Sequence, residues 1–151
     1  MKRIPHSIRF GLLTSSMLIA YFLILAAFHK HINPAFSFFN AVITAFGICE
    51  AVRLKKNENL ETFTYGEGFK TGVVTGFIAT LVFTVFFLLY ATEIHPTFLS
   101  ELLQTIKGGF NIDIGMVTFI VAIMGFATTI VVVLAVMQFF KKTSNLNQNH
   151  L

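Results

Sequence analysis

The sequence predicts an all-α integral membrane protein: a bundle of four transmembrane helices with a short amphipathic helix on its outer side. Long stretches without Asp, Glu, Lys, Arg or His occupy most of the chain, and about 20 apolar residues in a helix cross a bilayer. The hydrophobic fraction is 55% and the charged fraction only 12%, against about 25% charged residues in soluble domains. The charged residues gather in the connectors. The charge-free stretches are 10–28, 34–49, 72–92 and 114–140.

The chain length of 151 residues leaves room for one compact helical unit and no separate soluble domain. We predict a membrane domain over 1–142 and a polar, disordered tail over 143–151. The first apolar stretch is longer than the core of a signal peptide, which has about 7–15 residues. We therefore expect it to be retained as the first span. The predicted spans are 8–28, 34–54, 65–92 and 114–140.

Helix-start signals precede the second and third spans. Asn33 and Pro34 suit the N-cap and the first helical position of the second span. Thr64 and Glu67 fit a capping box, in which each side chain accepts a hydrogen bond from the other residue's backbone N–H. The third helix should therefore begin at Tyr65.

The connector before the fourth span is the longest, and it predicts an amphipathic helix on the outer membrane face, because apolar residues recur at helical spacing opposite polar ones. Tyr65 and Tyr90 bracket the third span and are the expected interfacial anchors, since the chain contains no Trp. The apolar positions of the amphipathic helix are Phe98, Leu99, Leu102, Leu103 and Ile106.

Basic residues are distributed unevenly between the two sides of the predicted bundle. Nine of the 11 Lys and Arg residues lie on one side, and the positive-inside rule places that side, with both termini and the central loop, in the cytoplasm. The other two are Lys30 and Lys107. The pI near 9.4 therefore reflects contact with the lipid bilayer and its anionic headgroups, and nucleic acid is not an expected partner.

Small residues recur every four positions along the third span, which predicts close helix packing. The fourth span offers a complementary set of small residues. Three partners remain open: the fourth span of the same chain, the same stripe of a second copy in a homo-oligomer, or a helix of a partner membrane protein. The candidate packing residues are Gly68, Gly72, Gly76, Thr80 and Thr84 on the third span, with Thr118, Ala122, Gly125 and Thr129 on the fourth.

Glu50, Arg53 and Lys70 are the ionisable residues expected nearest to the membrane interior. Charged groups at membrane depth are functional candidates. These three lie close to the cytoplasmic edge, where Arg53 and lipid headgroups can neutralise Glu50. The alternatives are a structural ion pair with solvated charges, or a role in coupling protons or ions.

The outer-side histidines and the one cysteine have ordinary and functional interpretations. His29, His31 and His95, near Glu93, are either interfacial residues or a metal site or pH sensor. Cys49 lies in an apolar setting that favours an inert thiol over a nucleophile.

No catalytic motif, cofactor motif or specific metal-ligand pattern is present in the sequence. The leading prediction is a non-enzymatic accessory, assembly or regulatory membrane protein that acts through helix packing. The alternative is a small transporter or channel subunit, although transporters usually carry broken helices or charges at mid-membrane.

The middle of the chain resembles a family of small bacterial membrane proteins, domain of unknown function 4199. The similarity rests on Gly47-Ile48, on the run from Thr64 to Gly72 with its Tyr-Gly-x-Gly-Phe-Lys-x-Gly pattern, and on Pro96 with Phe98. Cys49-Glu50 departs from the basic residue expected after Gly-Ile. The resemblance implies a multi-pass protein of the bacterial inner membrane, and it implies no activity, cofactor or catalytic residue.

Overall fold

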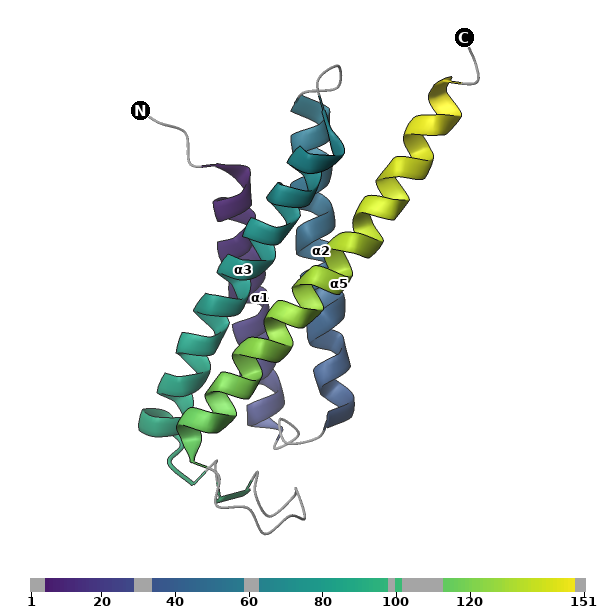
Figure 1. Ribbon diagram of the computed structural model, residues 1–151. Helices are drawn as coiled ribbons and strands as arrows, with labels where there is room; N and C mark the ends of the chain where they lie inside the picture. The colour runs from purple at the N-terminus through teal and green to yellow at the C-terminus, as the bar shows by residue number, and fades with distance from the viewer. Residues whose placement is uncertain (1–4, 29–33, 59–62, 98–99, 102–112, 149–151) are drawn as a thin grey trace.

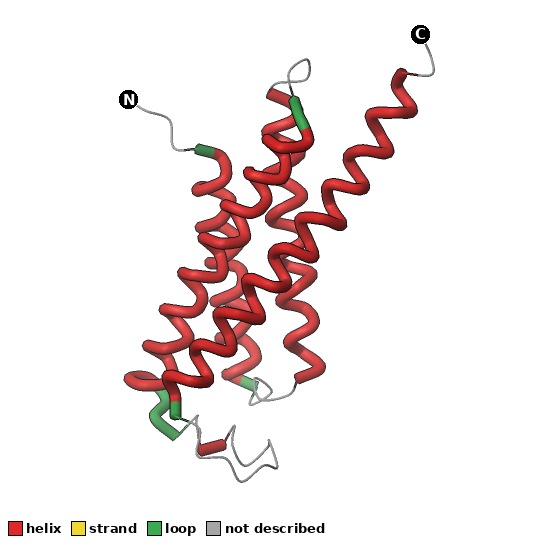
Figure 2. The backbone as a smooth tube through the Cα atoms, viewed as in Figure 1, coloured by secondary structure: helices red, strands yellow, loops and turns green. Residues whose placement is uncertain are grey.

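The protein folds as four long helices, described here from a computed structural model (Figure 1). The described residues are 5–28, 34–58, 63–97, 100–101 and 113–148. All regular structure within these ranges is helical (Figure 2). The elements are α1 (His6–Ala27), α2 (Pro34–Glu58), α3 (Tyr65–Leu89), the π-helical turn η1 (Tyr90–Ile94) and α5 (Ile114–Gln148).

Three of the four helices are long and apolar enough to cross a membrane: His6–Ala27, Tyr65–Ile94 and Ile114–Phe140. This confirms a membrane-type helical fold and three of the predicted spans by length and composition. Over its described residues α2 is not among these three helices. Charged residues enter its last two turns, from Arg53 to Glu58.

The four helices alternate in direction (Figure 1). The start of α1, the end of α2, the start of α3 and the end of α5 lie at one end of the bundle, which we call the terminal end. The remaining helix ends lie at the opposite end. An up-and-down arrangement of this kind is the expected result of short connectors between antiparallel neighbours.

The capping box predicted at the start of α3 is confirmed. Thr64 Oγ1 accepts a hydrogen bond from Glu67 N at 3.3 Å, and Glu67 Oε2 accepts one from Thr64 N at 3.4 Å. The predicted starts at Tyr65 and Pro34 also agree with the structure, whereas Asn33 lies outside the described residues.

The ends of the helices differ from the prediction. α2 continues to Glu58, beyond the expected end at 54, and α5 continues to Gln148, beyond 140. The tail expected to be disordered over 143–151 is therefore helical as far as Gln148, because polar residues without Gly or Pro extend a helix already started. Residues 149–151 lie outside the described part. Most of the predicted amphipathic helix does too, although Ser100 and Glu101 are helical.

The end of α3 winds into a π turn, which the sequence did not predict. His95 N donates to Tyr90 O at 2.9 Å, across five residues. Tyr90 is only 5% exposed, and its ring lies edge-on to Phe22 with centroids 5.0 Å apart. The expectation of an interfacial anchor is therefore wrong for Tyr90, because this residue shares the face of the helix that carries Phe83 and Phe87 and packs on Phe22. Tyr65 is 46% exposed, as an anchor requires.

Two clusters of buried residues form the core. An aromatic cluster joins α1 to α3 and η1 toward the opposite end, and an aliphatic cluster joins α2 to α5 toward the terminal end. The aromatic cluster is Phe22, Phe87, Tyr90 and Ala91. The aliphatic cluster is Ile48, Val52, Val133 and Met137.

Candidate functional site

The small-residue stripe of α3 begins against large side chains of α5. A Cβ atom built on Gly68 would lie 2.8 Å from Met137 Cε, and one built on Gly72 would lie 3.0 Å from Val133 Cγ2. Met137 and Val133 are 1% and 0% exposed. Glycine favours this approach, because a Cβ atom at position 68 would displace the end of the Met137 side chain and one at position 72 would press on Val133.

Farther along the two helices, glycine faces threonine. Gly76 of α3 lies against Thr129 of α5, and a Cβ atom built on Gly125 of α5 would lie 2.5 Å from Thr80 Cγ2 of α3. Each turn forward along α3 accompanies one turn back along α5, so the helices run antiparallel. The structure thus packs the predicted stripe within one chain. A homo-oligomer through the same residues would require α3 and α5 to separate.

Two further close contacts involve α1, and the sequence analysis did not identify them. A Cβ atom built on Gly11 would lie 2.7 Å from Ile78 Cβ, and Gly47 of α2 lies against Thr14 of α1. Neither glycine belongs to a repeating stripe, which is the only signal that single-sequence reasoning offers. These contacts fix α1 against both α2 and α3.

Hydroxyl groups are numerous in the interior, and most bond to their own helix. Thr14 Oγ1 donates to Phe10 O at 2.7 Å, and Thr44 Oγ1 donates to Asn40 O at 2.8 Å. Back-bonding of this kind satisfies a hydroxyl without a partner helix. The buried hydroxyl residues are Thr14, Ser15, Thr44, Thr71, Thr75, Thr80 and Thr129.

Thr75 also joins two helices. Its Oγ1 lies 2.8 Å from Thr71 O in α3 and 3.3 Å from Ser7 O in the first turn of α1. Thr75 is 0% exposed, so water does not compete for this hydroxyl. The contact ties the start of α1 to the middle of α3.

A second group of buried oxygen atoms has no hydrogen-bond partner within the described part of the chain. They are Asn40 Oδ1, Thr84 Oγ1, Thr118 Oγ1 and Thr129 Oγ1. An unpaired buried polar group costs about 1–3 kcal/mol, so these positions weaken the fold. Ala122, the remaining predicted packing residue, is partly buried on the same helix as Thr118.

The structure brings together two of the three predicted ionisable residues. Arg53 Nη1 lies 3.4 Å from Glu50 Oε1, one turn away on α2, with side chains 63% and 31% exposed. Lys70 is exposed on α3, and the described residues show no ion pair between it and Glu50. The pair is thus local to α2, and its exposure makes it a weak stabilising interaction.

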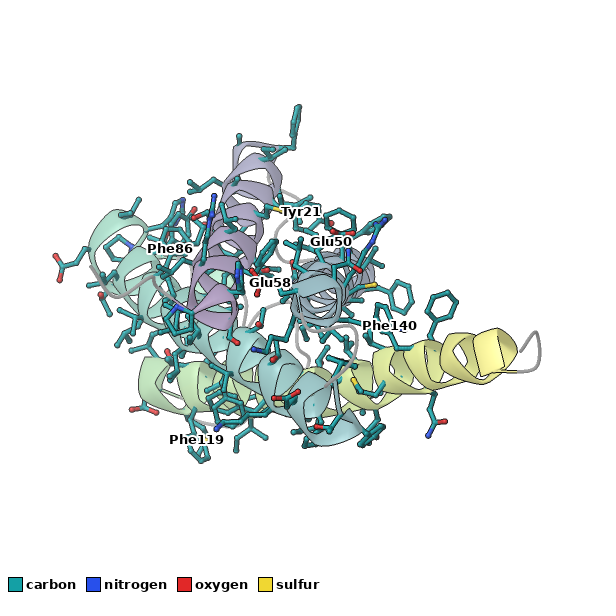
Figure 3. The ribbon with its side chains drawn as sticks, turned by 90° about the horizontal axis from the view of Figure 1, so that it is seen from above. Tyr21, Glu50, Glu58, Phe86, Phe119 and Phe140 are labelled. Carbon is teal, nitrogen blue, oxygen red and sulfur yellow. The ribbon has the colours of Figure 1, made fainter. Side chains whose placement is uncertain are left out.

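A contact between α1 and α2, which is an ion pair when His6 is protonated, was not anticipated. His6 Nε2 lies 2.7 Å from Glu58 Oε1, and Figure 3 shows Glu58 on the side of α2 that faces α1. The pair connects the first residue of α1 to the last residue of α2. No sequence spacing could indicate it, because only the fold brings these two helix ends together.

At the opposite end of the bundle, three polar side chains contact one another in a row: His95, Thr97 and Glu101. His95 Nδ1 and Glu101 Oε1 lie 3.1 Å and 3.4 Å from the hydroxyl of Thr97, and the His95 ring stacks on Tyr90 at 6.2 Å. His29 and His31 lie outside the described residues. Among the residues that the structure describes, no group of three or more His, Cys, Asp or Glu side chains is placed to hold a metal ion. Cys49 is partly buried.

The comparisons with known proteins give one match. No curated protein and no solved structure matches the chain. A family model described as protein of unknown function (DUF4199) matches residues 9–142. That range includes the stripe of α3, its partner face on α5, and Glu50, Arg53 and Glu58 of α2. The match covers most of the chain, and the protein therefore belongs to the DUF4199 family.

Proposed function

We propose that the protein is a four-span protein of the bacterial inner membrane, with both termini in the cytoplasm. We propose further that it is not an enzyme and serves as an accessory, assembly or regulatory subunit. Its partner would be another membrane protein or a second copy of the chain.

The proposal of four spans rests on the position of α2. This helix contacts α1, α3 and α5, and its apolar part runs beside three helices that can cross a bilayer. The helix ends at the terminal end of the bundle adjoin the segments that hold nine of the 11 Lys and Arg residues. An odd number of spans would divide these basic segments between the two sides of the membrane, against the positive-inside rule.

The arrangement is tested by reporter fusions in a bacterial host. A reporter active only in the cytoplasm is joined before α1, within the connector 59–64 after α2, and after Gln148 at the end of α5. We expect all three fusions to be active, and a periplasmic reporter at the same three positions to be silent. Opposite results before α1 and after α2 would overturn the proposal, because they require an odd number of spans in the α1–α2 part of the chain.

The close-packed interior is the observation that carries the functional proposal. Glycines on α1, α2, α3 and α5 meet side chains or backbone of a neighbouring helix, and the two core clusters are built from residues no more than 8% exposed. A tightly filled interior favours action through the outer surface. The apolar outer surface includes Phe119, which is 64% exposed and points away from the bundle in Figure 3.

The test is the mass and composition of the complex after gentle purification from the native membrane. A foreign protein in fixed stoichiometry would support the accessory-subunit proposal and would identify its process. A lone chain would count against it. A homo-oligomer would indicate that the protein acts as an assembly of its own copies. Such copies must contact each other through a surface other than the buried stripe.

The second candidate, a small transporter or channel subunit, is favoured by the unpaired buried oxygens. Asn40, Thr84 and Thr118 come from three different helices and hold such atoms. Polar atoms of this kind are suitable for water or a small solute in an alternative conformation. Substrate-dependent flux into liposomes, lost in Glu50→Gln or Lys70→Gln variants, would support this candidate. If flux is the same in these variants, Glu50 and Lys70 do not couple protons or ions to transport.

A further inference from the structure

A mixed cationic and aromatic surface forms where α2 and α5 separate. Ile48 and Val52 of α2 pack on α5, and Lys56 lies one turn beyond Val52 on the same face. The Lys56 Nζ lies over the Phe140 ring, 5.5 Å from its centroid. Beyond this contact α5 leans away from the other helices (Figure 1), and Phe140 lies between α2 and the end of α5 (Figure 3).

Arg53 stands beside Lys56 on α2, three positions earlier, and its side chain is 63% exposed. A guanidinium has five N–H donors, and the contact with Glu50, at 3.4 Å, is long for a charge-assisted hydrogen bond. Most of these donors remain available. We define the α2–α5 surface as Arg53 and Lys56 of α2 with Phe139 and Phe140 of α5.

The depth of this surface points to lipid. Phe139 and Phe140 are the last residues of the apolar stretch that can cross a membrane, Ile114–Phe140. Phe139 is 69% exposed, so it offers an apolar side chain to acyl chains. Cationic groups next to the last apolar residues of a span lie at the level of the headgroups.

We propose that the α2–α5 surface is a binding site for an anionic phospholipid. Arg53 and Lys56 hold the headgroup phosphate, and the acyl chains lie against the phenylalanines of α5. Two cations beside one phosphate favour a headgroup with net negative charge over a zwitterionic one. A soluble anion would use the cations and leave the exposed ring of Phe139 unoccupied. The inference requires that the chain lies in a bilayer, and it is independent of the accessory role.

The experiment is native mass spectrometry of the delipidated full chain in detergent. The protein is titrated with phosphatidylglycerol or with phosphatidylcholine of the same acyl chains. We expect one phosphatidylglycerol to bind more tightly than phosphatidylcholine. In the Arg53→Gln/Lys56→Gln variant, phosphatidylglycerol affinity should fall by at least about fivefold, the effect of roughly one basic residue at a membrane surface. Phosphatidylcholine binding should not change.

Three matched variants make the test specific. Lys70→Gln removes an exposed cation from α3 and should leave the phosphatidylglycerol affinity as it is. Lys56→Arg keeps the charge and should also retain binding. Glu50→Gln removes the carboxylate that competes with the phosphate for Arg53, so this variant should bind phosphatidylglycerol more tightly. The last two variants decide the question even where the double variant does not fold.

Three results would overturn the proposal. The first is equal affinity for the two lipids in the unchanged protein. The second is a loss in Lys70→Gln as large as that in the double variant, because binding would then follow the total charge and not this surface. The third is unchanged or weaker phosphatidylglycerol binding in Glu50→Gln.

Discussion

Gly76 of α3 and Thr129 of α5 are in contact, with no room for a side chain at position 76. Thr129 is 0% exposed, and its Oγ1 finds no hydrogen-bond partner in the described part of the chain. A Cβ atom built on Gly76 would lie 2.6 Å from Thr129 Oγ1, so the hydroxyl fills the space that a side chain at position 76 would need.

Replacing Gly76 with valine should destabilise the protein. The new side chain would occupy the space that Thr129 fills, and overpacking of a filled core costs about 1–3 kcal/mol. Circular dichroism of thermal unfolding in a fixed detergent measures the change. We expect a lower melting temperature and a wider separation of α3 from α5.

Gly66→Ala is the matched control for this substitution. Gly66 lies in the first turn of α3, and a Cβ atom built on it meets nothing within 4 Å. Because alanine is the better helix former, by up to about 1 kcal/mol, this variant should melt at the same temperature or higher. Equal destabilisation by both variants would contradict the packing interpretation of the stripe.

Thr129→Val should be neutral or stabilising. Valine has nearly the shape of threonine, and the change removes a buried hydroxyl that has no partner among the described residues. Leaving such a group unpaired costs about 1–3 kcal/mol, and part of this energy would be recovered. The same thermal unfolding experiment measures it. A clear loss of stability would show that the hydroxyl has a partner, such as an internal water molecule.

Thr75→Val should destabilise the protein, in contrast to Thr129→Val. The one proton of the Thr75 hydroxyl is shared between Thr71 O of its own helix, at 2.8 Å, and Ser7 O of α1, at 3.3 Å. Hydrogen bonds between membrane helices contribute about 0.6 kcal/mol on average, up to about 1.7. We expect a loss at the lower end of this range, with Thr75→Ser retaining most of the stability. Thr92→Val is the control, because the Thr92 hydroxyl is exposed and donates to Leu88 O, one turn earlier in the chain, and not to another part of the bundle.

Some features of the helix packing follow from the sequence alone, and others depend on the tertiary fold. The stripe of α3 and its complement on α5 could be identified, because a repeat of four positions marks one face of a helix. The start of α3 followed from Thr64 and Glu67, whose capping interaction is entirely local. Features with a local cause or a regular period were thus accessible from the sequence.

Features that depend on the tertiary fold could not be predicted from the sequence. Whether a threonine bonds across helices, as Thr75 does, or remains unpaired, as Thr129 does, depends on the neighbouring helix. The burial of Tyr90 depends on α1, because the ring of Phe22 packs against it. The ion pair of His6 with Glu58 depends on two helix ends that only the fold brings together.

Thr64→Ala should weaken the start of α3. The change removes the oxygen that accepts from Glu67 N, and loss of an N-cap costs about 1 kcal/mol. Thr64→Ser keeps the oxygen and should retain the stability. Hydrogen exchange of the amides in the first turn of α3 is the most direct measurement, because the effect is local. Equal exchange rates in the alanine and serine variants would contradict a role for the cap.

The His6–Glu58 pair should contribute little at equilibrium despite its short distance. Both side chains are partly exposed, 36% for His6 and 49% for Glu58, and exposed ion pairs contribute about 0.2–1 kcal/mol. A double-mutant cycle with His6→Gln and Glu58→Gln isolates the coupling energy from other effects of each change. We expect a coupling below about 1 kcal/mol. It should shrink as salt rises from 0.1 to 1 M, because the Debye length falls from about 10 to 3 Å. A larger coupling that salt does not reduce would show instead that this contact between α1 and α2 is shielded from water.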